Sequence, residues 1–291
     1  MPMGTHNSIF TYHQNSWHNG SIPLLKSADH GTWLGTLVFD GARWFNNQAP
    51  DLVPHCERVN ASAKALGMDP THSAQAMVDC VREGLKHFDE DSAVYIRPMY
   101  WSTGYGDGFI SADPASTDFA LCLQGIPMPS VDATASLTTT RFHRPTLDVA
   151  TVNAKAACLY PNNARMIQEA ISKGFTNALV TDALGNVAES ATSNVFMVKD
   201  GDVFTPVPNG TFLAGITRSR IMTLLRSDGV KVHESVLSLQ DFHSADEVFL
   251  TGNLAKVTPV THFDNTHYAK TFDIANRARD LYWDWAATTN F

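Results

Sequence analysis

The chain contains few cysteines and lacks the patterns that define several common protein classes. No Cys-x-x-Cys pair occurs, so the sequence predicts neither a metal site nor a disulfide framework. No apolar run approaches the roughly 20 residues that a membrane-spanning helix requires, and the first residues lack the charged and apolar regions of a signal peptide. We therefore expect a cytoplasmic protein with no membrane partner, whose cysteines are reduced and mostly buried: Cys56, Cys80, Cys122 and Cys158.

Positive charge is also scarce. The sequence has 21 lysines and arginines against 29 aspartates and glutamates, a formal net charge of -8. Such a chain has no general electrostatic attraction to nucleic acid, so small molecules are the expected partners. No internal repeat, Gly-x-Ser-x-Gly elbow or Gly-x-x-x-x-Gly-Lys loop is present, which argues against hydrolases and nucleotide-binding enzymes that depend on those motifs.

The first half of the chain predicts two helices and several strands. One helix is expected over residues 55–66, ending at Gly67, because glycine favours the left-handed cap conformation. The second is expected over 71–88, with four side chains toward a core: Ala76, Val78, Val81 and Leu85. Strands are predicted within 33–44, at 92–101 and at 119–123. A segment with two prolines, 125–130, predicts a linker.

The second half alternates strands with helices. Helices are predicted at 162–173, 217–226 and 272–286, and strands at 178–181, 187–189, 194–198, 203–205 and 247–251. The turn at 199–202 contains Gly201 and predicts a hairpin. Two unequal halves of mixed structure, α/β or α+β, indicate a cleft between them. We expect an N-terminal domain over 1–124, a linker over 125–134 and a C-terminal domain over 135–291.

The second half of the chain contains three segments whose residues could carry out chemistry. Lys155 lies in Asn-Ala-Lys-Ala-Ala-Cys-Leu-Tyr, which ends at Tyr160, and Glu189 begins Glu-Ser-Ala-Thr-Ser-Asn. A turn with Gly215, Ile216 and Thr217 then opens a helix. Each has an ordinary structural alternative: a surface-helix lysine, a solvated glutamate and a simple helix cap.

The order and spacing of these segments resemble the cofactor frame of the class IV aminotransferases, the fold-type IV superfamily, over residues 17–263. The resemblance implies a two-domain enzyme, with a smaller N-terminal α/β domain and a larger C-terminal domain that hold pyridoxal 5'-phosphate at their interface. It also implies a homodimer with shared active sites, in which a loop of the partner lines each pocket. Leu34 and residues 104–108 are candidates for that loop.

The same resemblance implies roles for the cofactor residues. Lys155 would form the Schiff base, Tyr160 would lie one helical turn further along, and Glu189 would meet the pyridine nitrogen. The amides of Gly215, Ile216 and Thr217 would bind the phosphate at a helix N-terminus, together with Arg58. Asn253 stands where the branched-chain enzymes usually carry a hydroxyl residue near the phosphate.

The substrate pocket resembles that of the branched-chain aminotransferases, through Val-Phe-Asp-Gly-Ala-Arg at 38–43 and Tyr-Ile-Arg-Pro at 95–98. Phe39 would line the pocket, and Tyr95 and Arg97 would hold a carboxylate; the alternative for Arg97 is an ion pair with Asp40. Leu34 replaces a pocket tyrosine of that branch, which makes the wall more apolar. Leu254 completes the expected substrate-binding set.

We therefore predict transfer of an amino group between a hydrophobic, branched-chain-like amino acid and a 2-oxo acid. The nearest alternative is an (R)-selective amine:2-oxo acid transaminase on the same fold, which Leu34 favours and the Tyr95–Arg97 pair disfavours. A D-amino-acid transaminase ranks lower, because that branch normally shows an Arg-x-His motif after the third strand and the segment 102–107 lacks it. An aminodeoxychorismate-type lyase ranks lower because of the branched-chain-like segments.

Overall fold

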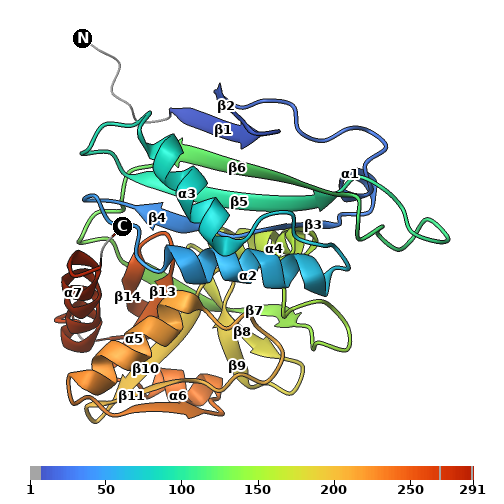
Figure 1. Ribbon diagram of the computed structural model, residues 1–291. Helices are drawn as coiled ribbons and strands as arrows, with labels where there is room; N and C mark the ends of the chain where they lie inside the picture. Colours follow the sequence, from blue (N-terminus) through green and yellow to red (C-terminus); the bar gives the residue numbers. More distant parts are fainter. Residues whose placement is uncertain (1–7, 269, 290) are drawn as a thin grey trace. The chain divides into compact units, whose positions relative to one another are not determined.

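The computed structural model describes residues 8–268, 270–289 and 291. The chain divides into two compact units (Figure 1). The first comprises Met1–Met128, Asn153–Cys158 and Thr289–Phe291, and the second comprises Pro129–Val152 and Leu159–Thr288. Lys155 thus belongs to the first unit, and Tyr160 and Glu189 belong to the second. Among the residues that the structure describes, none of the helices has the length and apolar character needed to span a membrane.

The first unit is built on a six-stranded sheet in the order β2-β1-β6-β5-β3, with β4 also paired to β5. Its strands are β1 (Ile9–His13), β2 (Ser16–Asn19), β3 (Leu37–Phe39), β4 (Ala42–Trp44), β5 (Val94–Ser102) and β6 (Thr117–Gly125). Its helices are α1 (His30–Trp33), α2 (Leu52–Ala65) and α3 (Ala74–Leu85). Both α2 and α3 pack on one face of the central strands β5 and β6 (Figure 1).

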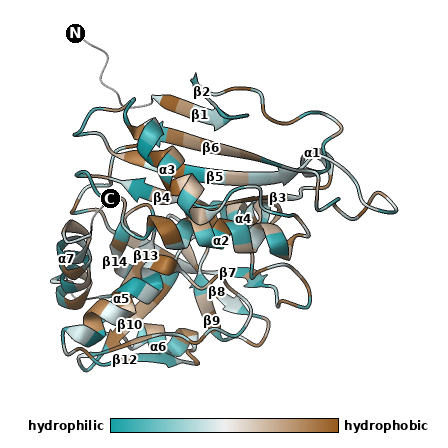
Figure 2. Ribbon diagram, in the orientation of Figure 1, coloured by the Kyte–Doolittle hydropathy of each residue, from teal (hydrophilic) through white to brown (hydrophobic). Residues whose placement is uncertain are grey.

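Alternation along β5 separates its two faces. Val94, Ile96 and Tyr100 are fully buried, whereas Tyr95 and Arg97 between them are only partly buried. Successive side chains of a strand point to opposite faces, so the buried set faces the helices and the other set faces away from them. The neighbouring β6 contains a run of five buried apolar residues, 119–123 (Figure 2), as expected for a central strand.

The second unit contains a nine-stranded mixed sheet in the order β12-β11-β10-β13-β14-β7-β8-β9, with β15 paired to β14. The strands in chain order are β7 (Ala135–Arg144), β8 (Asn177–Asp182), β9 (Val187–Ser190), β10 (Asn194–Lys199), β11 (Asp202–Pro206), β12 (Val232–Ser235), β13 (Glu247–Gly252), β14 (Lys256–Phe263) and β15 (Thr266–His267). The helices are the 3-10 turn η1 (Ala157–Leu159), which straddles the unit boundary, α4 (Tyr160–Ser172), α5 (Ile216–Ser227), α6 (Leu239–His243) and α7 (Asp273–Ala287).

Strand β10 shows how this sheet is covered. Phe196 and Val198 belong to a core with α5 and α7, while Val195 and Met197 belong to a core on the opposite face that includes Phe242 of α6. The Phe196 ring stacks on Phe249 of the neighbouring β13 at 4.9 Å. Burial on both faces fixes the register of β10 and β13, because a slip of one residue would exchange the two sets of side chains.

Many of the predicted elements are confirmed. The hairpin of β10 and β11 has Asp200 and Gly201 at positive φ, and Gly67 and Gly174 follow α2 and α4 in the left-handed region. The helix predicted over 71–88 is shorter, because Ser73 accepts a hydrogen bond from the Ala76 amide and caps the helix there. The prediction that Ala76 faces the core is wrong: Ala76 is exposed, and Met77 is fully buried instead.

Candidate active site

Lys155 lies in an extended segment that is tied to two elements of the first unit. The Phe39 amide donates to the Lys155 carbonyl over 3.1 Å, and the Lys155 amide donates to Ser62 Oγ on α2 over 3.0 Å. Val38 and Ala156 form an isolated antiparallel bridge. These three contacts fix the backbone on either side of the Lys155 side chain.

The Lys155 ammonium lies over the Phe39 ring, with Nζ 5.2 Å from the ring centroid. An aromatic face attracts a cation at this distance. Lys155 itself is not helical, because the bridge between Val38 and Ala156 holds its segment beside β3. The 3-10 turn η1 follows, and Tyr160 begins α4, with Pro161 in the first turn, so one short helical turn separates Lys155 from Tyr160.

Arg58 forms an ion pair with a fully buried aspartate. Arg58 Nε is 2.7 Å from Asp40 Oδ2, Nη2 donates to Oδ1 over 2.9 Å, and His55 Nδ1 is 2.7 Å from the same Oδ1. Burial alone would raise the pKa of Asp40, but Arg58 and His55 outweigh it and hold that pKa well below its usual range. The guanidinium is thereby fixed through its Nε edge.

Asp40 is therefore not the partner of Arg97, and that alternative is wrong. Arg97 Nη2 donates to Gln124 Oε1 over 3.0 Å, and the guanidinium carbon lies 5.3 Å from the centroid of the Tyr95 ring. Phe39 pairs with Met99 in the sheet, so Phe39, Tyr95 and Arg97 share the face that points away from α2 and α3. Leu34, predicted to line the pocket, caps the end of α1 and is half-buried.

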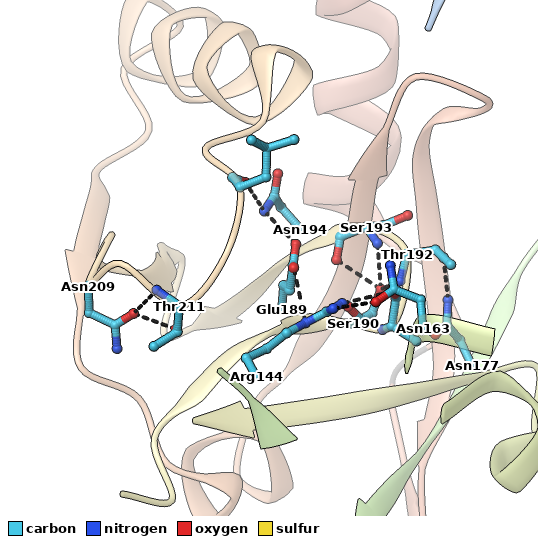
Figure 3. Close-up of polar contacts among 12 residues, drawn as sticks. Arg144, Asn163, Asn177, Glu189, Ser190, Thr192, Ser193, Asn194, Asn209 and Thr211 are labelled. Carbon is cyan, nitrogen blue, oxygen red and sulfur yellow. Dashed lines mark hydrogen bonds and ion pairs between the residues drawn. The ribbon is translucent and has the colours of Figure 1, made fainter. Parts of the chain in front are cut away.

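In the second unit, Glu189 on β9 is held through both carboxylate oxygens (Figure 3). Arg144 Nε lies 3.1 Å from Oε1, and Asn194 Nδ2 donates to Oε2 over 3.2 Å. Arg144 also donates to the carbonyls of Ser190 and Ala191, and to Asn163 Oδ1 on α4. The Glu189 and Arg144 side chains are only 13% and 9% exposed. The ion pair with Arg144 and the hydrogen bond from Asn194 thus fix the orientation of the Glu189 carboxylate.

The predicted phosphate turn is the start of α5. Gly215 is the N-cap residue and has no side-chain cap, so the first amides of this 12-residue helix point toward a place where an anion is favoured. A Cβ at Gly215 would overlap the Asn194 side-chain oxygen, which explains why glycine stands there. Thr217 is buried, and Arg218 beside it is bonded to Pro206 and Glu234.

Asn253 lies in the turn between β13 and β14, where its Oδ1 accepts a hydrogen bond from Lys256 Nζ over 2.8 Å. Leu254 next to it is half exposed. The structure thus groups the candidate residues into sets: Lys155 with Phe39, Arg58 with Asp40, and Arg97 with Tyr95 in the first unit; Glu189 with Asn194, and Asn253 with Lys256, in the second.

Two further residues of these sets carry no signal in the sequence. Arg144 stands 45 positions before Glu189, and no local pattern connects the two. Lys256 reads as an exposed hairpin lysine, yet its side chain is fully buried.

A family model described as amino-transferase class IV matches residues 37–263. The chain belongs to the class IV aminotransferases. This confirms the fold class and the enzyme class expected from the sequence. A probable branched-chain-amino-acid aminotransferase from Rickettsia felis is 30% identical over 276 residues, which are 91% of this chain and 93% of the relative.

Solved structures of class IV aminotransferases agree with this assignment. An aminotransferase from Brucella abortus, bound to the cofactor PLP, is 55% identical with a TM-score of 0.94, over 97% of this chain and 100% of that one. A branched-chain amino acid aminotransferase from T.th., complexed with N-(5'-phosphopyridoxyl)-L-glutamate, is 26% identical with a TM-score of 0.86, over 97% and 94% of the two chains.

Proposed function

We propose that this class IV aminotransferase is a pyridoxal phosphate-dependent transaminase, in which Lys155 is the catalytic lysine and the substrates are a hydrophobic, branched-chain-like amino acid and a 2-oxo acid. The observation that carries the proposal is the Lys155 amine over Phe39, on a sheet face that also presents Tyr95 and Arg97. Lys155 and the proposed carboxylate-binding pair thus belong to the same compact unit.

The residues present fit pyridoxal phosphate. The first amides of α5 have no side-chain cap, and such amides suit a phosphate. The Glu189 carboxylate, oriented by Arg144 and Asn194, suits a protonated ring nitrogen. When bound, the cofactor supplies an aldehyde that condenses with amines and a ring that accepts electrons from the substrate Cα.

The chain's own residues then have distinct tasks. Lys155 would hold the cofactor through its amine, and its free amine would carry the proton to and from the substrate Cα. Arg58, oriented by Asp40, is proposed to contact the phosphate, and Tyr160 to contact the ring. Arg97 and Tyr95 orient the substrate carboxylate, and Phe39, Leu34 and Leu254 line its apolar side.

An (R)-selective amine transaminase is the second candidate, because Leu34 provides an apolar wall that suits an amine without a carboxylate. The T.th. relative holds an L-glutamate adduct, which supports an amino acid as one substrate. The homodimer and the cytoplasmic location stay predictions; sedimentation equilibrium of the purified holoenzyme tests the first.

Borohydride reduction of the holoenzyme, followed by peptide mapping, tests the assignment of Lys155. We expect the reduced cofactor on Lys155 alone, and we expect Lys155→Ala to lose covalent label and nearly all turnover while it keeps some cofactor through its phosphate. The fully buried Lys256 is the internal comparison. Label on Lys256 or on any other lysine would contradict the proposal.

A further inference from the structure

Lys256 combines two unfavourable features. Its side chain is fully buried, and its backbone has φ +65°, in the left-handed region that favours glycine. It is the first residue of β14, directly after the three-residue turn 253–255, and it pairs with Gly252. A side chain other than glycine or asparagine costs about 1 kcal/mol there, and a buried ammonium must also be desolvated. Such an outlier indicates a function for the side chain.

The side chain of Lys256 reaches Asn253, three residues earlier. Nζ donates to Asn253 Oδ1 over 2.8 Å, and Nζ lies 5.4 Å from the centroid of the buried Tyr282 ring. An ammonium has only donors, so it can bind only the oxygen of the Asn253 amide. Lys256 therefore decides which way the amide is turned, and the NH2 group must point away from it.

The NH2 group of Asn253 is a buried donor whose acceptor is not supplied by the described residues. Asn253 Nδ2 is buried and has no hydrogen-bond partner within the described part of the chain, and the same holds for Oγ1 of Thr251, a residue only 2% exposed. A buried donor without a partner is costly, so an acceptor is expected at this position.

The surroundings of Asn253 are those of the proposed phosphate site. Thr251 on β13 pairs directly with Asn194 on β10, and Asn194 is the residue that a Cβ at Gly215 would overlap. The uncapped start of α5 and the end of β13 therefore meet at Asn194. Gly252 lies against Ser193, whose Oγ would be 3.1 Å from a Cβ at that position.

We propose that Lys256 is a positioning residue: it holds the Asn253 amide with Oδ1 inward, so that Nδ2 donates to the cofactor phosphate. This rests on the proposed function, because the anion is the phosphate of that cofactor. A hydroxyl residue at position 253 can rotate and needs no such partner, whereas an amide turned the wrong way would present its oxygen to the phosphate and repel it.

The test measures phosphate recognition rather than turnover. Apoenzyme of the wild type, Lys256→Met, Asn253→Thr and the double variant is titrated with pyridoxal phosphate, with pyridoxal and with inorganic phosphate. Lys231→Met is the matched control, because it removes a largely exposed lysine of the same unit. We expect Lys256→Met to raise the Kd of pyridoxal phosphate and of inorganic phosphate about tenfold, which corresponds to about 1.4 kcal/mol, with the Kd of pyridoxal unchanged. In the Asn253→Thr background the same change should have less than a twofold effect.

Three outcomes overturn the proposal. Unchanged phosphate affinity in Lys256→Met would show that the lysine is purely structural. An equal loss of affinity in the wild-type and Asn253→Thr backgrounds would show a direct effect of the lysine charge. An equal loss of affinity for pyridoxal would show local collapse of the site. If Lys256→Met does not fold, Asn253→Asp replaces it. A carboxylate paired with Lys256 should lower the affinity for pyridoxal phosphate more than tenfold and leave the affinity for pyridoxal unchanged. Unchanged affinity for pyridoxal phosphate would overturn the proposal. A wild type that binds pyridoxal phosphate no better than pyridoxal would instead refute the phosphate site itself.

Discussion

Arg144 Nε lies 3.1 Å from Glu189 Oε1, and the same guanidinium donates to Asn163 on α4, the helix that begins at Tyr160 (Figure 3). Arg144 thus links the strand that carries Glu189 to the helix that carries Tyr160, within one unit. Two elements with proposed cofactor contacts share one buried cation.

Arg144→Met should destabilise the protein, because it leaves the Glu189 carboxylate without its cation. Loss of one partner of a largely buried pair costs about 3 kcal/mol. Urea unfolding measures the change. Arg277→Met, which breaks an exposed pair with Asp228, is the control and should change stability much less, because solvent screens an exposed pair. Relative to Arg144→Met, the double variant Arg144→Met/Glu189→Gln should recover part of the stability and none of the turnover. Recovery of turnover in the double variant would show that Glu189 has no catalytic task.

Glu189→Gln alone should slow turnover. Loss of a preorganised charge raises the activation barrier by several kcal/mol. Cofactor binding should persist, since the phosphate contacts are unchanged. Absorbance of the bound cofactor measures loading, and single-turnover kinetics measures the chemical step. Near-normal turnover by a fully loaded variant would contradict the role of Glu189.

Arg97→Ala separates the two candidate functions. A guanidinium contact to the substrate carboxylate is worth about 2 to 4 kcal/mol, so kcat/KM for L-leucine should fall roughly 30- to 1000-fold, with a much smaller effect on (R)-1-phenylethylamine. Gln124→Ala removes only the observed partner of Arg97 and should have a smaller effect on L-leucine.

The donor assay uses pyruvate and 2-oxoglutarate as acceptors. A wild type that ignores L-leucine and accepts the amine would favour the amine transaminase. If Arg97→Ala leaves every amino and oxo acid unaffected, the arginine is structural.

Asp40→Asn should change how the free energy of unfolding depends on pH in acidic solution. The pKa of Asp40 is depressed in the folded state, so its contribution is fully present above the unfolded pKa of about 4 and is lost as the pH falls below that value. In that range the unfolded state binds one proton more than the native state, so stability rises with pH. Urea unfolding between pH 5 and 3 should show a shallower pH dependence in the variant; an unchanged slope would show that Asp40 is not the group responsible.

Thiol labelling should find one reactive cysteine, Cys158, which is exposed. Burial raises the pKa of Cys56 and of Cys80 to about 12, and burial also raises that of Cys122. A thiol with a pKa of about 12 is about 1 part in 10,000 thiolate at pH 8. Native protein should therefore react with one equivalent of a thiol reagent, and Cys158→Ser should react with none. Fast reaction of a second thiol in the native state would contradict this burial.

The motifs along the chain, through their resemblance to the class IV aminotransferases, predict Lys155, Glu189 and the turn at Gly215 as candidate site residues. The hairpin around Gly201 and the ends of helices at Gly67 and Gly174 follow from the conformational freedom of glycine. These features are local, so a short stretch of sequence contains the information.

Which side chains meet depended on the tertiary fold. The Lys155 segment is extended because Phe39 and Ser62, more than 90 positions away, bond its backbone. Asp40 pairs with Arg58 and not with Arg97, because Arg97 projects from the face of β5 opposite the one that α2 covers. Arg144 and Lys256 are buried beside Glu189 and Asn253, which lie far from Arg144 and close to Lys256 in the sequence. Burial and cross-strand register depend on the whole sheet, and no local pattern encodes them.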